Sequence, residues 1–119
     1  MKDTQPAEAG GVVAPTYTAT IYIAGELEVM RATCSDYCLR LGQCVSLTPT
    51  EYIFTGGTER GAAIGFINYP RFPAPKEQIE RRAIELANLL LNDCCQRSCS
   101  VVCGDTTIYL TNPDITVGR

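Results

Sequence analysis

Apolar side chains recur along this chain at two spacings, every second residue and every third or fourth residue, and these spacings predict its strands and helices. Residues 17–23 alternate between alanine or isoleucine on one face and threonine or tyrosine on the other, which is typical of a strand with one buried face. Residues 26–41 then space their apolar side chains for one face of a helix, and Gly42 is a favourable helix stop. A strand and a helix in this order begin a layered domain.

The longest strand-forming segment, residues 44–75, predicts a β-hairpin that runs into a proline-stiffened loop. Its two strands, residues 44–55 and 62–69, are rich in β-branched and aromatic side chains, and we expect the glycines of the intervening GGTERG to make the reversal. Pro49 indicates an edge strand or a bulge, because proline lacks the N–H group that a central strand needs. Residues 62–69 are largely apolar on both faces, which predicts a central strand.

The C-terminal half repeats the alternation of helix and strand. Residues 76–93 predict a second amphipathic helix, residues 98–103 a strand, and residues 106–110 a short strand that pairs back on it. The order strand, helix, strand, strand, helix, strand predicts an α+β fold, the ferredoxin-like βαββαβ sandwich, with a short extra C-terminal β-hairpin strand. Right-handed crossovers place the strands at residues 17–23 and 62–69 in the middle of the antiparallel sheet.

We expect a single ferredoxin-like domain, residues 17–111, between a flexible N-terminal leader at residues 1–16 and a C-terminal tail at residues 112–119. Both helices cover one face of the sheet, so the opposite face, which carries Tyr22 and the threonines beside it, is left open. An apolar sheet face is usually covered by a partner. We therefore expect a homo-oligomer, formed through the sheet face or the sheet edges.

Composition excludes several classes of function. The 119 residues carry a net charge of −3 and a pI near 4.9, without the basic surface typical of nucleic-acid binding, so we expect no nucleic-acid partner. No apolar run is long enough to cross a membrane and the first residues do not resemble a signal peptide, which predicts a cytoplasmic protein without a membrane partner. The chain has no histidine, which excludes His-dependent triads and most zinc enzyme sites.

The seven cysteines are an odd number, so at least one thiol is free. Most of them occupy positions where the strand and helix patterns need apolar residues: Cys34, Cys38, Cys94, Cys99 and Cys103. Burial as small hydrophobic residues is the favoured interpretation, with Cys44 and Cys95 near the surface and no cofactor. The alternative is a thiolate site for zinc or an iron–sulfur cluster, although the spacing is not that of paired C-x-x-C motifs.

The segment most typical of a binding site is the loop at residues 66–73, FINYPRFP. Its prolines restrict the backbone, and a rigid loop that presents an arginine can hold a carboxylate or a phosphate at little entropic cost. We predict that a small anionic ligand binds to this loop and to one arginine at the hairpin reversal. The candidate ligand-binding residues are Asn68, Tyr69, Arg71, Phe72 and Arg60. In the alternative interpretation, Tyr69 and Phe72 pin the loop to the core and Arg71 pairs with a helix carboxylate.

Three stretches, TATIYIAG, CVSLTPTEYIFTGG and GFINYPRFPAP, resemble a group of small uncharacterised proteins found in phages and prophages of proteobacteria. The similarity covers roughly residues 17–111, and INYPRFP is its most specific part. The group has no known activity and so implies no catalytic residues. It implies a phage accessory protein that acts in the bacterial host cell by binding, either by blocking a host defence complex or by sequestering a nucleotide signal.

Together these features favour a non-enzymatic, oligomeric binding protein that captures a small anionic, nucleotide-like ligand, with a counter-defence role in the host. An enzyme is disfavoured because no nucleophile is paired with a recognisable base. Two alternatives stay open. One is an inhibitor that masks a host defence protein such as a CRISPR complex, and the other is a cysteine-thiolate metal-binding protein.

Overall fold

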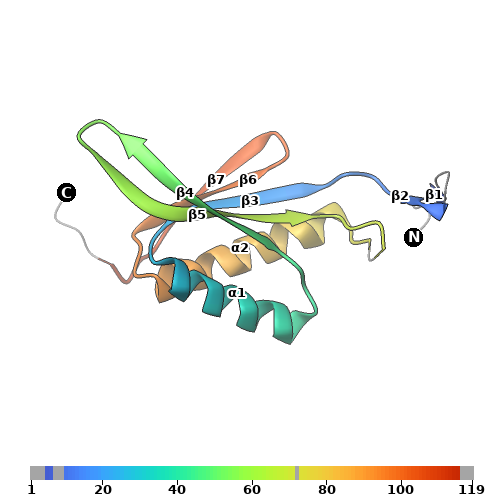
Figure 1. Cartoon of the computed structure of the whole chain (residues 1–119), viewed down its shortest axis with the longest axis horizontal. Coiled ribbons are helices and arrows are strands. Elements are labelled where there is room, and N and C mark those ends of the chain that lie inside the picture. Colours follow the sequence, from blue (N-terminus) through green and yellow to red (C-terminus); the bar gives the residue numbers. More distant parts are fainter. Residues whose placement is uncertain (1–4, 7–9, 72, 116–119) are drawn as a thin grey trace.

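A five-stranded antiparallel sheet forms one layer of the molecule and two helices form the other (Figure 1). The computed structural model describes residues 5–6, 10–71 and 73–115. The elements of the two layers follow the predicted order: β3 (Thr18–Ala24), α1 (Leu27–Leu41), β4 (Ser46–Phe54), β5 (Gly57–Ile67), α2 (Lys76–Asp93), β6 (Ser98–Cys103) and β7 (Thr106–Thr111). The strand order β4-β5-β3-β6-β7 confirms the ferredoxin-like arrangement, with β3 and β5 inside the sheet and β7 as the added strand.

The core lies between the helices and the sheet face that they cover. Buried and more exposed side chains alternate along β3, and Ile21 and Ile23 are almost completely shielded from water. The largest fully buried side chains come from both layers: Phe66, Ile21, Ile23, Met30, Ile64, Leu86, Leu90, Leu91 and Val101. The other face of the sheet, which we call the open face, has no helix on it (Figure 1).

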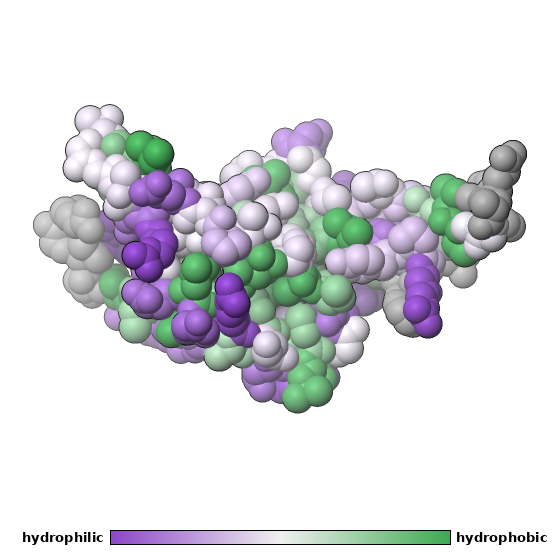
Figure 2. Space-filling model, in the orientation of Figure 1, coloured by the Kyte–Doolittle hydropathy of each residue, from purple (hydrophilic) through white to green (hydrophobic). Residues whose placement is uncertain are grey.

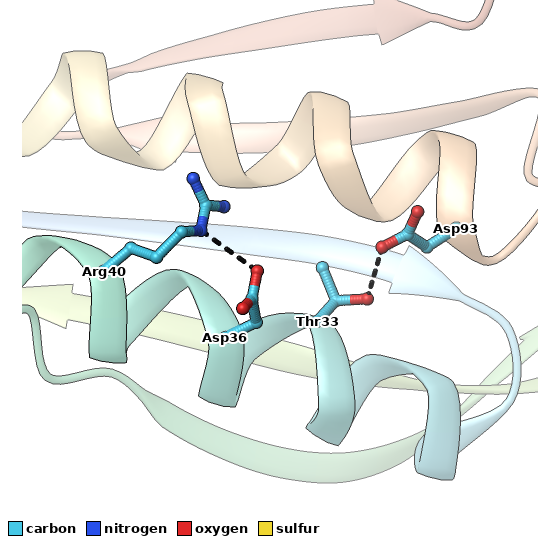
Figure 3. Close-up of polar contacts among 4 residues, drawn as sticks. All are labelled: Thr33, Asp36, Arg40 and Asp93. Carbon is cyan, nitrogen blue, oxygen red and sulfur yellow. Dashed lines mark hydrogen bonds and ion pairs between the residues drawn. The ribbon is translucent and has the colours of Figure 1, made fainter.

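A polar contact joins the two helices, and a second polar contact lies within α1 (Figure 3). The Thr33 hydroxyl on α1 donates a hydrogen bond of 2.7 Å to the carboxylate of Asp93 at the end of α2, and this contact is partly buried. Asp36 and Arg40, in the same view, form an exposed ion pair of 3.0 Å within α1. Water screens this exposed pair, so we expect the contact between the helices to contribute more to stability.

The reversal between β4 and β5 differs from the predicted one. Only Thr55 and Gly56 connect the strands, and the positive φ of 91° at Gly56 makes the turn. The rest of the predicted turn belongs to β5, so the hairpin is longer than expected and extends beyond the body of the sheet (Figure 1). Gly61 serves close packing, because a Cβ atom there would collide with the Ile23 carbonyl oxygen. Pro49 lies on the edge strand β4, as predicted.

The ends of the chain carry structure that the sequence pattern did not predict. Within the expected leader, β1 (Gln5–Pro6) pairs with β2 (Val12–Val13). After β7, the backbone N–H of Asn112 donates to the Arg97 carbonyl oxygen at 2.8 Å, and its side-chain amide donates to the Leu91 carbonyl oxygen at 3.2 Å. The first residue of the expected tail therefore packs into the domain.

All seven cysteines are free thiols, and their burial follows the prediction. Cys44 and Cys95 are exposed, and the other five are buried or half-buried. Burial raises the pKa of three of these thiols to about 11: Cys34, Cys94 and Cys99. Within the described residues, no three cysteine, aspartate or glutamate side chains lie close enough together to hold a metal ion. In the same part of the chain, no helix has the length and apolar character that crossing a membrane requires.

Candidate functional site

The open face carries a cavity of about 760 Å³, which we call the site cavity. Side chains from all five strands of the sheet line it, together with the connection between α2 and β6. The β4–β5 and β6–β7 hairpins both extend on the side of the sheet away from the helices (Figure 1). Four aromatic side chains line this cavity: Tyr22, Tyr52, Phe54 and Tyr109.

Strand register explains why these side chains meet. Tyr22 on β3 lies opposite Ser100 on β6, and Ser100 lies opposite Tyr109 on β7, so the three share one row of the open face. Tyr52 on β4 lies opposite Glu59 on β5 in the same way. Residues far apart in the sequence therefore lie side by side on one surface.

Contacts with β5 fix the position of the Tyr52 ring. Its hydroxyl donates a hydrogen bond of 2.7 Å to the Ala62 carbonyl oxygen. A Cβ atom at Gly61 would lie 2.8 Å from the ring, so the glycine makes room for it. Burial is the main cause that raises the pKa of Tyr52, so the hydroxyl stays protonated and remains a donor at neutral pH.

Glu59 is the one carboxylate that lines the site cavity among the described residues. Its side chain is exposed and makes no hydrogen bond or ion pair with any residue in the described part of the chain. Aromatic faces attract cations and stack on flat rings, and a carboxylate beside them adds a full negative charge. This arrangement suits a ligand that carries both an aromatic base and a positive charge.

The connection between α2 and β6 forms part of the wall of the site cavity through Cys95, Gln96 and Arg97. The Gln96 N–H donates to the Leu91 carbonyl oxygen at 2.9 Å and the Cys95 N–H donates to Asn92 at 3.2 Å, the bonds of a Schellman helix ending. Cys95 has a φ of 53° at the position where glycine is usual. The exposed Cys95 thiol is thus presented at the site cavity from a strained backbone.

A second cavity of about 250 Å³ adjoins the site cavity. Glu59 and Gln96 line both cavities, and Arg60, Glu26 and Gly25 line the second one. Glu59 therefore lies at the junction of the two. Arg60 is the predicted ligand-binding residue that the structure brings to this region, although it lies within β5 and not at the hairpin reversal.

The other predicted ligand-binding residues lie past the opposite end of β5. Both ends of the buried Asn68 amide are used within the chain, since it donates to the Pro15 carbonyl oxygen at 2.7 Å and accepts from the Ala74 N–H at 2.6 Å. The Tyr69 hydroxyl accepts a hydrogen bond from the Cys44 thiol at 3.6 Å. Arg71 is exposed, and Phe72 lies outside the described residues. A ligand-binding role for this loop stays a prediction.

No protein-family model and no curated protein sequence matches this chain. Two solved structures share its fold. Both are of a phage SAM lyase. The structure in the apo state has a TM-score of 0.66 at 19% identity and matches 84% of this chain and 92% of the lyase chain. The complex with S-methyl-5'-thioadenosine has a TM-score of 0.67 at 18% identity, over 85% of this chain and 93% of the lyase chain. At this identity the similarity shows the fold.

This comparison corrects the expected class of function. The prediction of a non-enzymatic binding protein is wrong on this finding, because the two solved structures described above are of an enzyme. The expectation of a small ligand agrees with the bound S-methyl-5'-thioadenosine of the lyase. The comparisons do not support the alternatives of a protein inhibitor or a thiolate metal protein. The homo-oligomer stays a prediction.

Proposed function

We propose that this chain is a lyase that binds S-adenosylmethionine (SAM) in the site cavity and cleaves it to S-methyl-5'-thioadenosine (MTA). The observation that carries the proposal is the site cavity itself, with its four aromatic side chains and the Glu59 carboxylate. SAM combines an adenine ring, which stacks on aromatic faces, with a sulfonium cation, which a carboxylate and aromatic faces attract. The fold shared with a phage SAM lyase supports the same conclusion.

The chemistry of SAM places few demands on the protein. MTA is SAM without its four-carbon amino acid fragment, so the bond that breaks joins the sulfur to the side chain of that fragment. The sulfur keeps the bonding pair and leaves as a neutral thioether. Because a lyase adds no water, the fragment balances the loss by closing its own carboxylate oxygen onto the carbon that the sulfur leaves, which forms a lactone.

The protein's contribution is then to bind and orient SAM rather than to supply a nucleophile. The aromatic side chains hold the adenosine part, and Glu59 faces the sulfonium. Holding a flexible substrate in one conformation lowers the entropic part of the barrier. This function needs no histidine and no paired nucleophile and base.

Formation of MTA from SAM, measured by liquid chromatography and mass spectrometry, tests the proposal. Ser100→Trp would fill the site cavity between Tyr22 and Tyr109, and we expect it to abolish both MTA formation and MTA binding. Thr107→Trp is the matched control, since Thr107 is exposed on β7 outside the site cavity. A folded wild-type protein that neither forms nor binds MTA overturns the proposal.

We also propose that copies of the chain associate through the open face and the β4–β5 hairpin. Apolar surface is exposed near the tip of this hairpin (Figure 2), where Ile53 and Phe54 are 77% and 52% exposed. Tyr109 on the open face is 68% exposed. Exposed apolar groups of this size are typical of an interface. Light scattering coupled to size exclusion measures the mass in solution, and a monomer at micromolar concentration would contradict this proposal.

Two further parts of the proposal concern the origin of the chain and the place where it acts. Both structural neighbours are phage proteins, which supports the phage origin that the INYPRFP resemblance predicts. A SAM lyase meets its substrate inside a cell, so we place the protein in the cytoplasm of the bacterial host. Fractionation of infected cells tests this location.

A further inference from the structure

The second cavity is lined by two side chains of opposite charge that do not form an ion pair with each other. Arg60 from β5 and Glu26 before α1 both line it. Neither side chain makes an ion pair or a hydrogen bond with any residue in the ranges 10–71 and 73–115. Asp36–Arg40 and Lys76–Glu80 do form ion pairs, each within one helix. Arg60 and Glu26 are thus free to contact a molecule in the cavity.

The Glu26 carboxylate is also not used by the helix that follows it. Glu26 is the residue immediately before α1, where an acidic side chain often caps the helix. Here its side chain makes no capping hydrogen bond. The helix therefore does not compete with a ligand for this carboxylate.

We propose that the second cavity binds the amino acid end of SAM, with Arg60 on the α-carboxylate and Glu26 on the α-ammonium. This inference rests on the proposed function. An α-amino acid carries one negative and one positive group on the same carbon, and the second cavity offers a partner of opposite charge for each of them. The guanidinium also matches a carboxylate in geometry, because it can donate two parallel hydrogen bonds.

The order of the two cavities agrees with the order of groups in SAM. Glu59 and Gln96 line both cavities, so these two residues form the part of the lining that the cavities share. If the adenosine part occupies the aromatic site cavity and the amino acid end occupies the second cavity, the sulfonium that joins them lies at this junction. The negative charge of Glu59 is then beside the one positive charge in the middle of the substrate.

Two neutral relatives of SAM separate this inference from the proposed function. S-adenosylhomocysteine (SAH) keeps the amino acid end but has a neutral sulfur, and MTA lacks the amino acid end. We expect Arg60→Ala to weaken SAH binding by about 10-fold to 100-fold, the usual cost of losing a charged hydrogen bond. MTA binding should stay within about twofold, since no group of MTA reaches Arg60. Isothermal titration calorimetry gives both dissociation constants.

Matched variants exclude loss of folding as the cause. Arg81→Ala removes an exposed arginine on α2 that lines neither cavity, and it should leave both affinities unchanged. Arg60→Lys keeps the charge and should recover part of the SAH affinity. Glu26→Gln should weaken SAH and not MTA.

The outcomes distinguish the two claims. If wild-type protein binds MTA and Arg60→Ala binds SAH as tightly as wild type does, the inference is overturned while the proposed function stands. An equal loss of SAH and MTA affinity also overturns it, because Arg60 would then act on the shared adenosine part. A wild-type protein that binds neither compound overturns the proposed function and this inference together.

Discussion

Replacing Glu59 by glutamine tests whether its charge binds the substrate or takes part in the chemical step. The substitution keeps the shape of the side chain at the junction of the two cavities and removes one negative charge. In the cleavage, the positive charge on sulfur disappears as the bond breaks. A carboxylate beside that sulfur therefore attracts the bound substrate more strongly than the transition state.

The size of the effect follows from Coulomb's law. Two unit charges about 4 Å apart attract by about 1 kcal/mol in water and by about 4 kcal/mol at the effective dielectric constant of a protein surface. Glu59 is exposed, so we take the lower part of this range. We expect Glu59→Gln to raise KM for SAM by roughly 10-fold, with kcat unchanged or slightly higher. The affinities for SAH and MTA should not change, because neither carries a charge on sulfur.

Initial rates of MTA formation over a range of SAM concentrations give KM and kcat separately. The effect of Glu59→Gln on KM should shrink as salt is added, since salt screens an exposed pair of charges. Asp105→Asn, in the turn between β6 and β7, removes a carboxylate outside both cavities and serves as the control. A large fall in kcat at unchanged KM would refute the reasoning and give Glu59 a role in proton removal. Equal loss of SAH affinity would refute it too.

Four further predictions concern stability and reactivity. Thr33→Val should lower the free energy of unfolding by about 1 kcal/mol, because it removes the partly buried bond between the helices, whereas Arg40→Ala should cost less than about 0.5 kcal/mol in the same urea titrations. Cys95→Gly should raise the free energy of unfolding by about 1 kcal/mol, because glycine adopts the positive φ without strain. In the wild-type protein, MTA should slow the alkylation of Cys95 but not that of Cys44, as measured by peptide mass spectrometry. The contribution of the buried thiols to stability should be constant below about pH 8, and stability should fall as the pH rises from 9 to about 11, because the unfolded chain releases thiol protons from groups whose folded-state pKa is raised from 9.0 to about 11. A rise of stability between pH 9 and about 11 would contradict the burial of Cys34, Cys94 and Cys99.

The secondary structure could be predicted because each element carries its own periodic pattern. The alternation in β3 and the helical spacing in α2 each predict an element with one buried face from neighbouring residues alone. Both elements lie where they were predicted. The predicted position of the reversal between β4 and β5 was wrong, because the sequence has three glycines near it and only Gly56 makes the turn. The close approach that requires Gly61 depends on β3, a strand far away in the sequence.

The site could not be predicted because its residues belong to five different strands, to the connection between α2 and β6, and to the segment after β7. Periodicity assigns Tyr22 to the outer face of its strand, but it does not show which other outer faces lie beside it. Tyrosines on the outer faces of β3, β4 and β7 were the available signal. Arg60 was selected for its charge alone, and nothing in the sequence pattern indicates that Glu26 and Glu59 line the same cavity.

The expectation of a non-enzyme rested on a search for a nucleophile paired with a base. That search is appropriate for hydrolysis, in which the protein must activate the attacking group. A sulfonium compound carries its own leaving group, so an enzyme that acts on it can be built from binding groups alone. The absence of histidine excludes a class of mechanisms and not catalysis itself.

The division of the molecule into a covered face and an open face has a consequence for its evolution. Stability depends on the side chains between the helices and the sheet, whereas Tyr22 and Tyr109 on the outer side are 43% and 68% exposed. Substitutions on the outer side can therefore accumulate without unfolding the domain, and a library randomised there should yield mostly folded variants. The same scaffold can in this way acquire selectivity for new ligands while its sequence diverges.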